Sequence, residues 1–65
     1  MLVKLRLDQA RERASRSGHD SIMLLVETIA APPEVLNAVI ELYSEEGLRA
    51  VIVDGSLRVG PKPRP

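Results

Sequence analysis

Three residue types that occur in hydrolytic triads lie close together in the chain. Ser17 offers a hydroxyl nucleophile, His19 a base and Asp20 a carboxylate. Triads assemble from separate segments, however, because side chains that are near neighbours in sequence point in different directions. We therefore interpret this stretch as a turn between two elements. The sequence predicts no catalytic residue and no enzyme.

Acidic side chains are the next candidates, because carboxylates bind hard cations. Glu41 and Glu45 lie one helical turn apart, and Glu34 and Glu46 are near them. A hard cation needs several oxygens that converge from a rigid loop, and a helix face does not supply them. The single His19 and the absence of cysteine exclude a Cys/His zinc site. We expect no metal and no cofactor.

A mixture of cationic and apolar residues is the strongest functional signal. If the first segment and the last two form one sheet, alternation places their basic side chains together on the face away from the helices. Valines lie among them, which favours a binding surface over an ordinary hydrated face. The sequence therefore predicts a protein interface made of Lys4, Arg6, Arg49, Val51, Val53 and Arg58.

An alternative function is nucleic-acid binding by basic residues near the two ends of the chain. The formal net charge is zero, but residues 1–19 carry a net +3, residues 20–54 a net −6 and the remainder a net +3. Such a balance does not require binding to phosphate. Tyr43 is the only aromatic residue, so a stacking platform for bases is absent. The alternative site consists of Arg11, Arg13, Arg16, Lys62 and Arg64.

The elements that must position these residues are clearest between residues 33 and 59. Apolar residues at spacings of three and four predict a helix that begins at Pro33 and stops at Gly47. Asp54-Gly55 then predicts a two-residue hairpin turn. The register follows from the turn, and it pairs Val53 with Ser56, Ile52 with Leu57, Val51 with Arg58 and Ala50 with Val59.

The segments before residue 33 give weaker patterns. Val3, Leu5 and Leu7 alternate with other residues, which indicates a strand, and Asp8 then caps a helix over residues 9–17 that Gly18 ends. Residues 20–31 suit either a buried strand or a helix. We favour the strand, because a helix that runs into Ala31-Pro32-Pro33 would end without a glycine.

The strand interpretation predicts a two-layer α/β fold in the order β-α-β-α-β-β, with parallel crossovers and two helices on one face of a four-stranded sheet. The helix interpretation predicts β-α-α-α-β-β, which is similar to a winged helix. Residues 1–60 form a single small domain in either case, and residues 61–65 form a basic, proline-rich tail that we expect to be disordered.

Small size favours association, because a chain of 65 residues buries little surface and has no cysteine for a cross-link. We expect a regulatory or accessory protein that forms a homo-oligomer, or binds another protein, through the open sheet face or the hairpin edge. No apolar run is long enough to span a bilayer and no signal-peptide pattern is present, so we expect a cytoplasmic protein without membrane contact.

Overall fold

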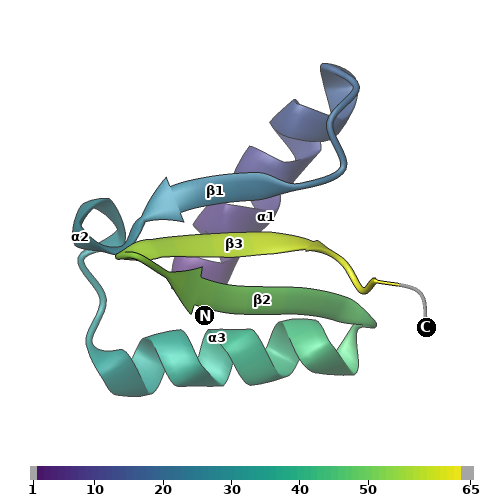
Figure 1. Cartoon of the computed structure of the whole chain (residues 1–65). Coiled ribbons are helices and arrows are strands. Elements are labelled where there is room, and N and C mark those ends of the chain that lie inside the picture. Colours follow the sequence, from purple (N-terminus) through teal and green to yellow (C-terminus); the bar gives the residue numbers. More distant parts are fainter. Residues whose placement is uncertain (1, 64–65) are drawn as a thin grey trace.

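The structure, a computed structural model, describes residues 2–63. It is a small α+β fold with a three-stranded antiparallel sheet in the strand order β1-β3-β2. Helices α1 and α3 cover one side of the sheet, and α3 runs alongside β2 (Figure 1). The elements in chain order are α1 (Leu2–Arg16), β1 (Ile22–Leu25), α2 (Val26–Ile29), α3 (Pro33–Glu45), β2 (Leu48–Val53) and β3 (Ser56–Pro61).

The first element is one long helix, so the strand expected over the opening residues is wrong, whereas the helix expected over residues 9–17 is confirmed as far as Arg16. Helical spacing places Val3, Leu7 and Ala14 on the side that faces the molecule, and Leu7 is only 2% exposed. Leucine, lysine and arginine are good helix formers, so the alternation in this segment does not require a strand. Asp8 consequently lies in the middle of α1 and caps nothing. The predicted stop is confirmed, since Gly18 has a φ of +85°.

Residues 20–31 divide into a strand and a single helical turn. The strand interpretation is confirmed for Ile22–Leu25, which excludes the winged-helix order, but α2 begins directly afterwards at Val26. β1 and β2 each pair antiparallel with β3, so they run parallel to each other, as the expected crossover through α3 requires. The crossover expected from the first segment is wrong, and the sheet has three strands instead of four, because that segment is helical. The hairpin returns β3 between β1 and β2, so the two strands that flank α3 in sequence are not adjacent.

The helix and hairpin after residue 33 are confirmed in detail. Pro33 opens α3, and Gly47 adopts a φ of +82° just after its end. Asp54 and Gly55 both have positive φ, as a two-residue turn of this type requires. The four predicted pairs of β2 and β3 are present, and the ladder extends to Leu48 opposite Pro61. Residue 61 therefore belongs to the sheet, although the sequence suggests that the tail begins there.

The core lies between the sheet and the two long helices. Alternate residues of the strands point inward, and Ala50, Leu57 and Val59 are buried there, as the hairpin register predicts. The helices complete the core with Leu7 from α1 and with Val39 and Tyr43 from α3. The helices therefore cover one side of the sheet and leave the other side uncovered by any part of residues 2–63.

Candidate functional site

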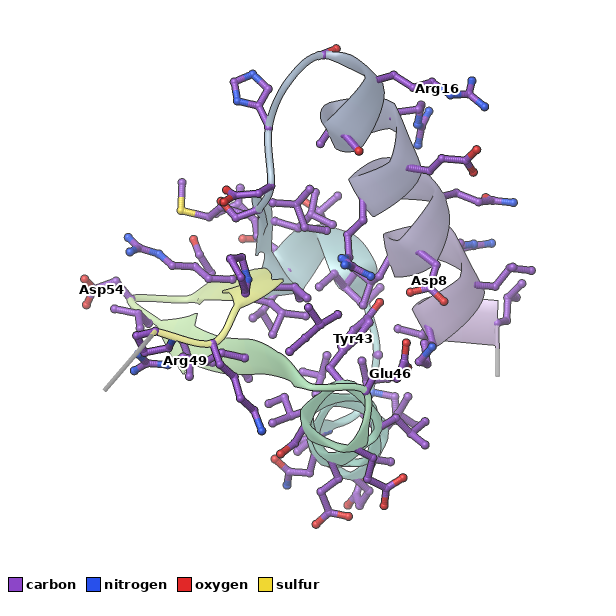
Figure 2. All side chains as sticks on the ribbon, turned by 90° about the vertical axis from the view of Figure 1, so that its right-hand side faces the viewer. Asp8, Arg16, Tyr43, Glu46, Arg49 and Asp54 are labelled. Carbon is purple, nitrogen blue, oxygen red and sulfur yellow. The ribbon has the colours of Figure 1, made fainter. Side chains whose placement is uncertain are left out.

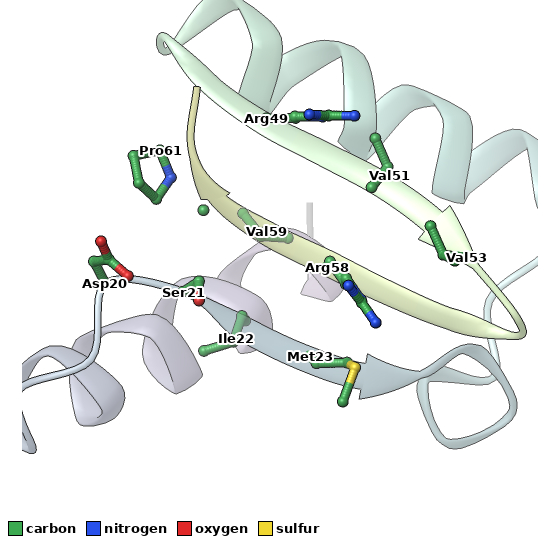
Figure 3. A pocket seen from close by; sticks show the side chains of 11 residues that line it. Asp20, Ser21, Ile22, Met23, Arg49, Val51, Val53, Arg58, Val59 and Pro61 are labelled. Atoms are coloured by element: carbon green, nitrogen blue, oxygen red, sulfur yellow. The ribbon is translucent and has the colours of Figure 1, made fainter. Parts of the chain in front are cut away.

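The uncovered side of the sheet carries a mixed cationic and apolar surface. Residues that are paired across the strands share a face, so Met23, Arg58 and Val51 form one row with the arginine in the middle. These side chains line a shallow, open depression (Figure 3). The next row of this face toward the hairpin turn consists of Leu25, Ser56 and Val53. Arg49, opposite Gly60, lies in the next row of the same face away from the turn.

Part of this surface is apolar and exposed. Met23 is 61% exposed, Leu25 57% and Val53 41%. Arg49, Val51, Val53 and Arg58 lie together, as predicted. Sequence reasoning missed the two β1 residues, because a continuous apolar run resembles a strand that is buried on both faces. The structure exposes them since β1 lies at an edge and only its inner face meets a helix.

The outer edge of β1 presents unpaired backbone groups. The Val26 N–H donates to the Gly55 oxygen at 2.9 Å, which continues the ladder between β1 and β3 by one pair. Hydrogen-bonded and non-bonded pairs alternate in an antiparallel ladder, so Ile22 and Leu24 bond toward β3. The N–H and C=O groups of Met23 and Leu25 consequently point outward, where residues 2–63 provide no further strand.

Lys4 and Arg6 do not belong to this surface, because α1 places them on the other side of the sheet. The Lys4 ammonium lies 3.0 Å from Asp8 Oδ2 and 2.7 Å from Glu46 Oε2. Arg6 lines a small apolar groove between α1, β1 and α2. The predicted interface therefore loses both N-terminal residues, since it assumed a strand where α1 lies.

A polar cluster joins α1 to α3 around the buried Tyr43. The Tyr43 hydroxyl donates to Asp8 Oδ1 at 2.8 Å, and Glu46 lies close by (Figure 2). The cations of Lys4 and Arg11 lie 5.1 Å and 5.6 Å from the centroid of the tyrosine ring. These contacts satisfy the hydroxyl of a residue that is 0% exposed. The cluster therefore holds the two helices together, while the carboxylates of Asp8 and Glu46 stay partly exposed.

The same cluster shifts the acidity of its members. Partial burial raises the pKa of Asp8, but hydrogen bonds from Tyr43 and Lys4 outweigh it, so the pKa lies below its ordinary value. Burial, and then the hydrogen bond to Asp8, raises the pKa of Tyr43 well above its ordinary value. Hydrogen bonds to Glu46 and Asp8 raise the pKa of Lys4. Asp8 is therefore ionised and Tyr43 neutral at physiological pH.

The described basic residues of the alternative nucleic-acid site lie in different surroundings. Arg16 pairs with Glu12 at 2.8 Å, Arg11 covers Tyr43, and Arg13 is exposed on α1. Lys62 donates to the Ser44 oxygen at 3.4 Å, near the end of α3. Arg64 lies outside the described residues. No observation thus favours nucleic-acid binding.

Ser17, His19 and Asp20 are exposed in the connection between α1 and β1, and no hydrogen bond joins them among the described residues. Residues 2–63 contain no group of three potential metal ligands. None of the helices in this range is both long enough and apolar enough to cross a bilayer. Comparison with known proteins gives no guide to function, because no family model, curated protein or solved structure matches the chain significantly.

Proposed function

We propose that the protein is a non-enzymatic interaction module whose partner is a second copy of the same chain. The observation that carries the proposal is β1, which lies at the edge of the sheet and exposes Met23 and Leu25 by more than half. Natural edge strands usually contain a charge or a proline that prevents pairing with another chain. The sequence Ile22-Met23-Leu24-Leu25 contains neither.

Charge and size support association. The formal net charge is zero, so copies of the chain do not repel one another strongly. The core is small, since residues 2–63 contain seven buried hydrophobic residues, and this part of the chain has no disulfide that adds stability. A second copy that binds only the folded chain shifts the folding equilibrium toward the folded state.

The contact is expected to be weak. Burying an exposed leucine or methionine completely gains about 1.5–3 kcal/mol, and here each side chain is already partly covered. Association loses translational and rotational freedom worth about 4–15 kcal/mol. We therefore expect a dimer that forms reversibly between about 10 µM and about 1 mM.

Light scattering after size-exclusion chromatography tests this proposal. The mass should rise with concentration from 7.1 kDa toward twice that value. Met23→Lys with Leu25→Lys should keep the mass at the monomer value, because edge charges oppose pairing. Asn37→Lys with Ser44→Lys adds the same charge to exposed positions of α3 and should leave association unchanged. A monomer at every concentration would contradict the proposal.

A further inference from the structure

The free edge of β1 determines how two copies would meet, provided that the proposed self-association holds. We propose that β1 pairs antiparallel with β1 of a second copy, with Met23 opposite Met23 across a two-fold axis. The two sheets then join into one continuous sheet. The outward N–H of Met23 in each copy donates to the Met23 C=O of the other copy.

The outward backbone groups select this register. A two-fold pairing centred on Met23 uses the outward groups of Ser21, Met23 and Leu25 in both copies. A two-fold pairing centred on Leu24 uses only the outward groups of Met23 and Leu25. A two-fold pairing centred on Leu25 would require residues of α2 to pair as a strand. The register centred on Met23 therefore satisfies the largest number of backbone groups.

The side chains on the two faces of the joined sheet are compatible with this register. On the outer face Met23 meets Met23, and Leu25 meets Ser21. On the inner face Ile22 of the second copy lies opposite Leu24, which lines an apolar groove of about 140 Å³. The groove lies beside the pairing edge and offers apolar contact to the second copy. Its lining consists of Val3, Arg6, Leu7, Leu24, Thr28 and Ile29.

Charge and the position of α3 disfavour the other contacts between copies. Stacking the uncovered faces about a two-fold axis would bring Arg58, at the centre of the face, toward Arg58 of the other copy. The outer edge of β2 is flanked by α3 (Figure 1). Edge pairing through β1 places no like charges opposite each other in the ladder, because residues 21–25 are uncharged.

Single cysteines test the register, since the natural chain contains none. Met23→Cys should form a disulfide-linked dimer under mild oxidation, because directly opposed residues lie within the Cα separation that a disulfide spans. Leu25→Cys is the matched control on the same strand and face. It should remain monomeric on a denaturing gel, because its counterpart lies several residues away along the strand. A link formed by Leu24→Cys but not by Met23→Cys would overturn this register.

A proline substitution tests the backbone contact itself. Met23→Pro removes only an outward N–H, so the circular dichroism spectrum should persist while the dimer is lost. Val51→Asp and Arg58→Glu change the uncovered face on β2 and β3 and leave the β1 edge intact. These two variants should therefore keep the mass of the wild-type chain.

The outcomes separate the two proposals. If the wild-type chain dimerises but Val51→Asp or Arg58→Glu abolishes dimerisation, the faces stack, and edge pairing is wrong while self-association stands. If the wild-type chain remains monomeric at every concentration, both proposals fail.

Discussion

At the scale of single residues, Asp8 has the greatest influence on how the helices meet. Its carboxylate accepts hydrogen bonds from Tyr43 and Lys4, and Arg11 lies 3.9 Å away. A carboxylate with several donors is stabilised in its ionised form, and replacing it leaves the buried Tyr43 hydroxyl with a weaker partner. The interface between α1 and α3 should therefore depend on pH.

This dependence can be measured through Asp8→Asn. The folded-state pKa of Asp8 lies below its unfolded value of about 3.9, so its stabilisation is present above that pH and is lost as pH falls through the folded-state pKa. Urea unfolding should show the variant less stable by about 1 kcal/mol at pH 7, with a smaller difference at pH 2. Glu41→Gln, at an exposed position of α3, is the control. An equal difference at both pH values would contradict the role of the charge.

Gly60 is the second residue at which a single atom matters. A Cβ added there would lie 2.8 Å from the Ser21 Cβ, at the point where β3 passes the start of β1. Gly60→Ala should therefore destabilise the fold by about 1–3 kcal/mol. Ser21→Gly in the same chain removes the contacting atom and should recover part of the loss. Thermal unfolding of the two single variants and the double variant measures this coupling, and additive effects would show that the contact is unimportant.

At the scale of elements, the left-handed backbone of Gly47 marks the end of α3. Gly47 has a φ of +82°, and an added Cβ would have no heavy atom within 4 Å. Gly47→Ala should therefore cost about 1 kcal/mol from the left-handed backbone and nothing from packing. Gly47→Asn should cost less, because asparagine tolerates this conformation. Equal losses in the two variants, measured by urea unfolding, would indicate a different cause.

Elements with local stop and turn signals could be predicted from the sequence. Pro33, Gly47 and Asp54-Gly55 fix the bounds of α3 and the register of the hairpin through short-range sterics, and the structure confirms them. The same register correctly placed Arg49 and Arg58 together. These features depend on neighbours in the chain rather than on the rest of the fold.

The first helix and the sheet order could not be predicted in this way. Leu2–Leu7 satisfies both an alternating and a helical pattern, and only the packing of Val3 and Leu7 against the core decides between them. The insertion of β3 between β1 and β2 likewise depends on long-range pairing. The candidate surface lost Lys4 because its segment is helical, and it gained Met23 because β1 lies at the edge with its outer face uncovered.

At the scale of the whole molecule, the helices cover only one side of the sheet. Exposed apolar residues occur both on the uncovered side of the sheet and on α1. Met23 and Leu25 lie on the uncovered side, whereas Leu2 and Leu5 of α1 are 61% and 52% exposed. Figure 1 shows that α1 passes behind β1 and extends past it. Pairing of two copies along β1 would therefore bring the α1 helices toward each other beneath the joined sheet.

Amide hydrogen exchange at two concentrations tests this assembly without any substitution. In the dilute monomer, the Leu24 amide bonds toward β3 and should exchange slowly, whereas the outward amides of Met23 and Leu25 should exchange quickly. In the concentrated sample, the Met23 and Leu25 amides should become protected, because carbonyl oxygens of a second copy accept hydrogen bonds from them. The Val51 amide, inside the hairpin ladder, should be protected in both samples and is the internal control. Unchanged exchange at Met23 and Leu25 in a sample that light scattering shows to be dimeric would mean that the copies meet somewhere other than β1.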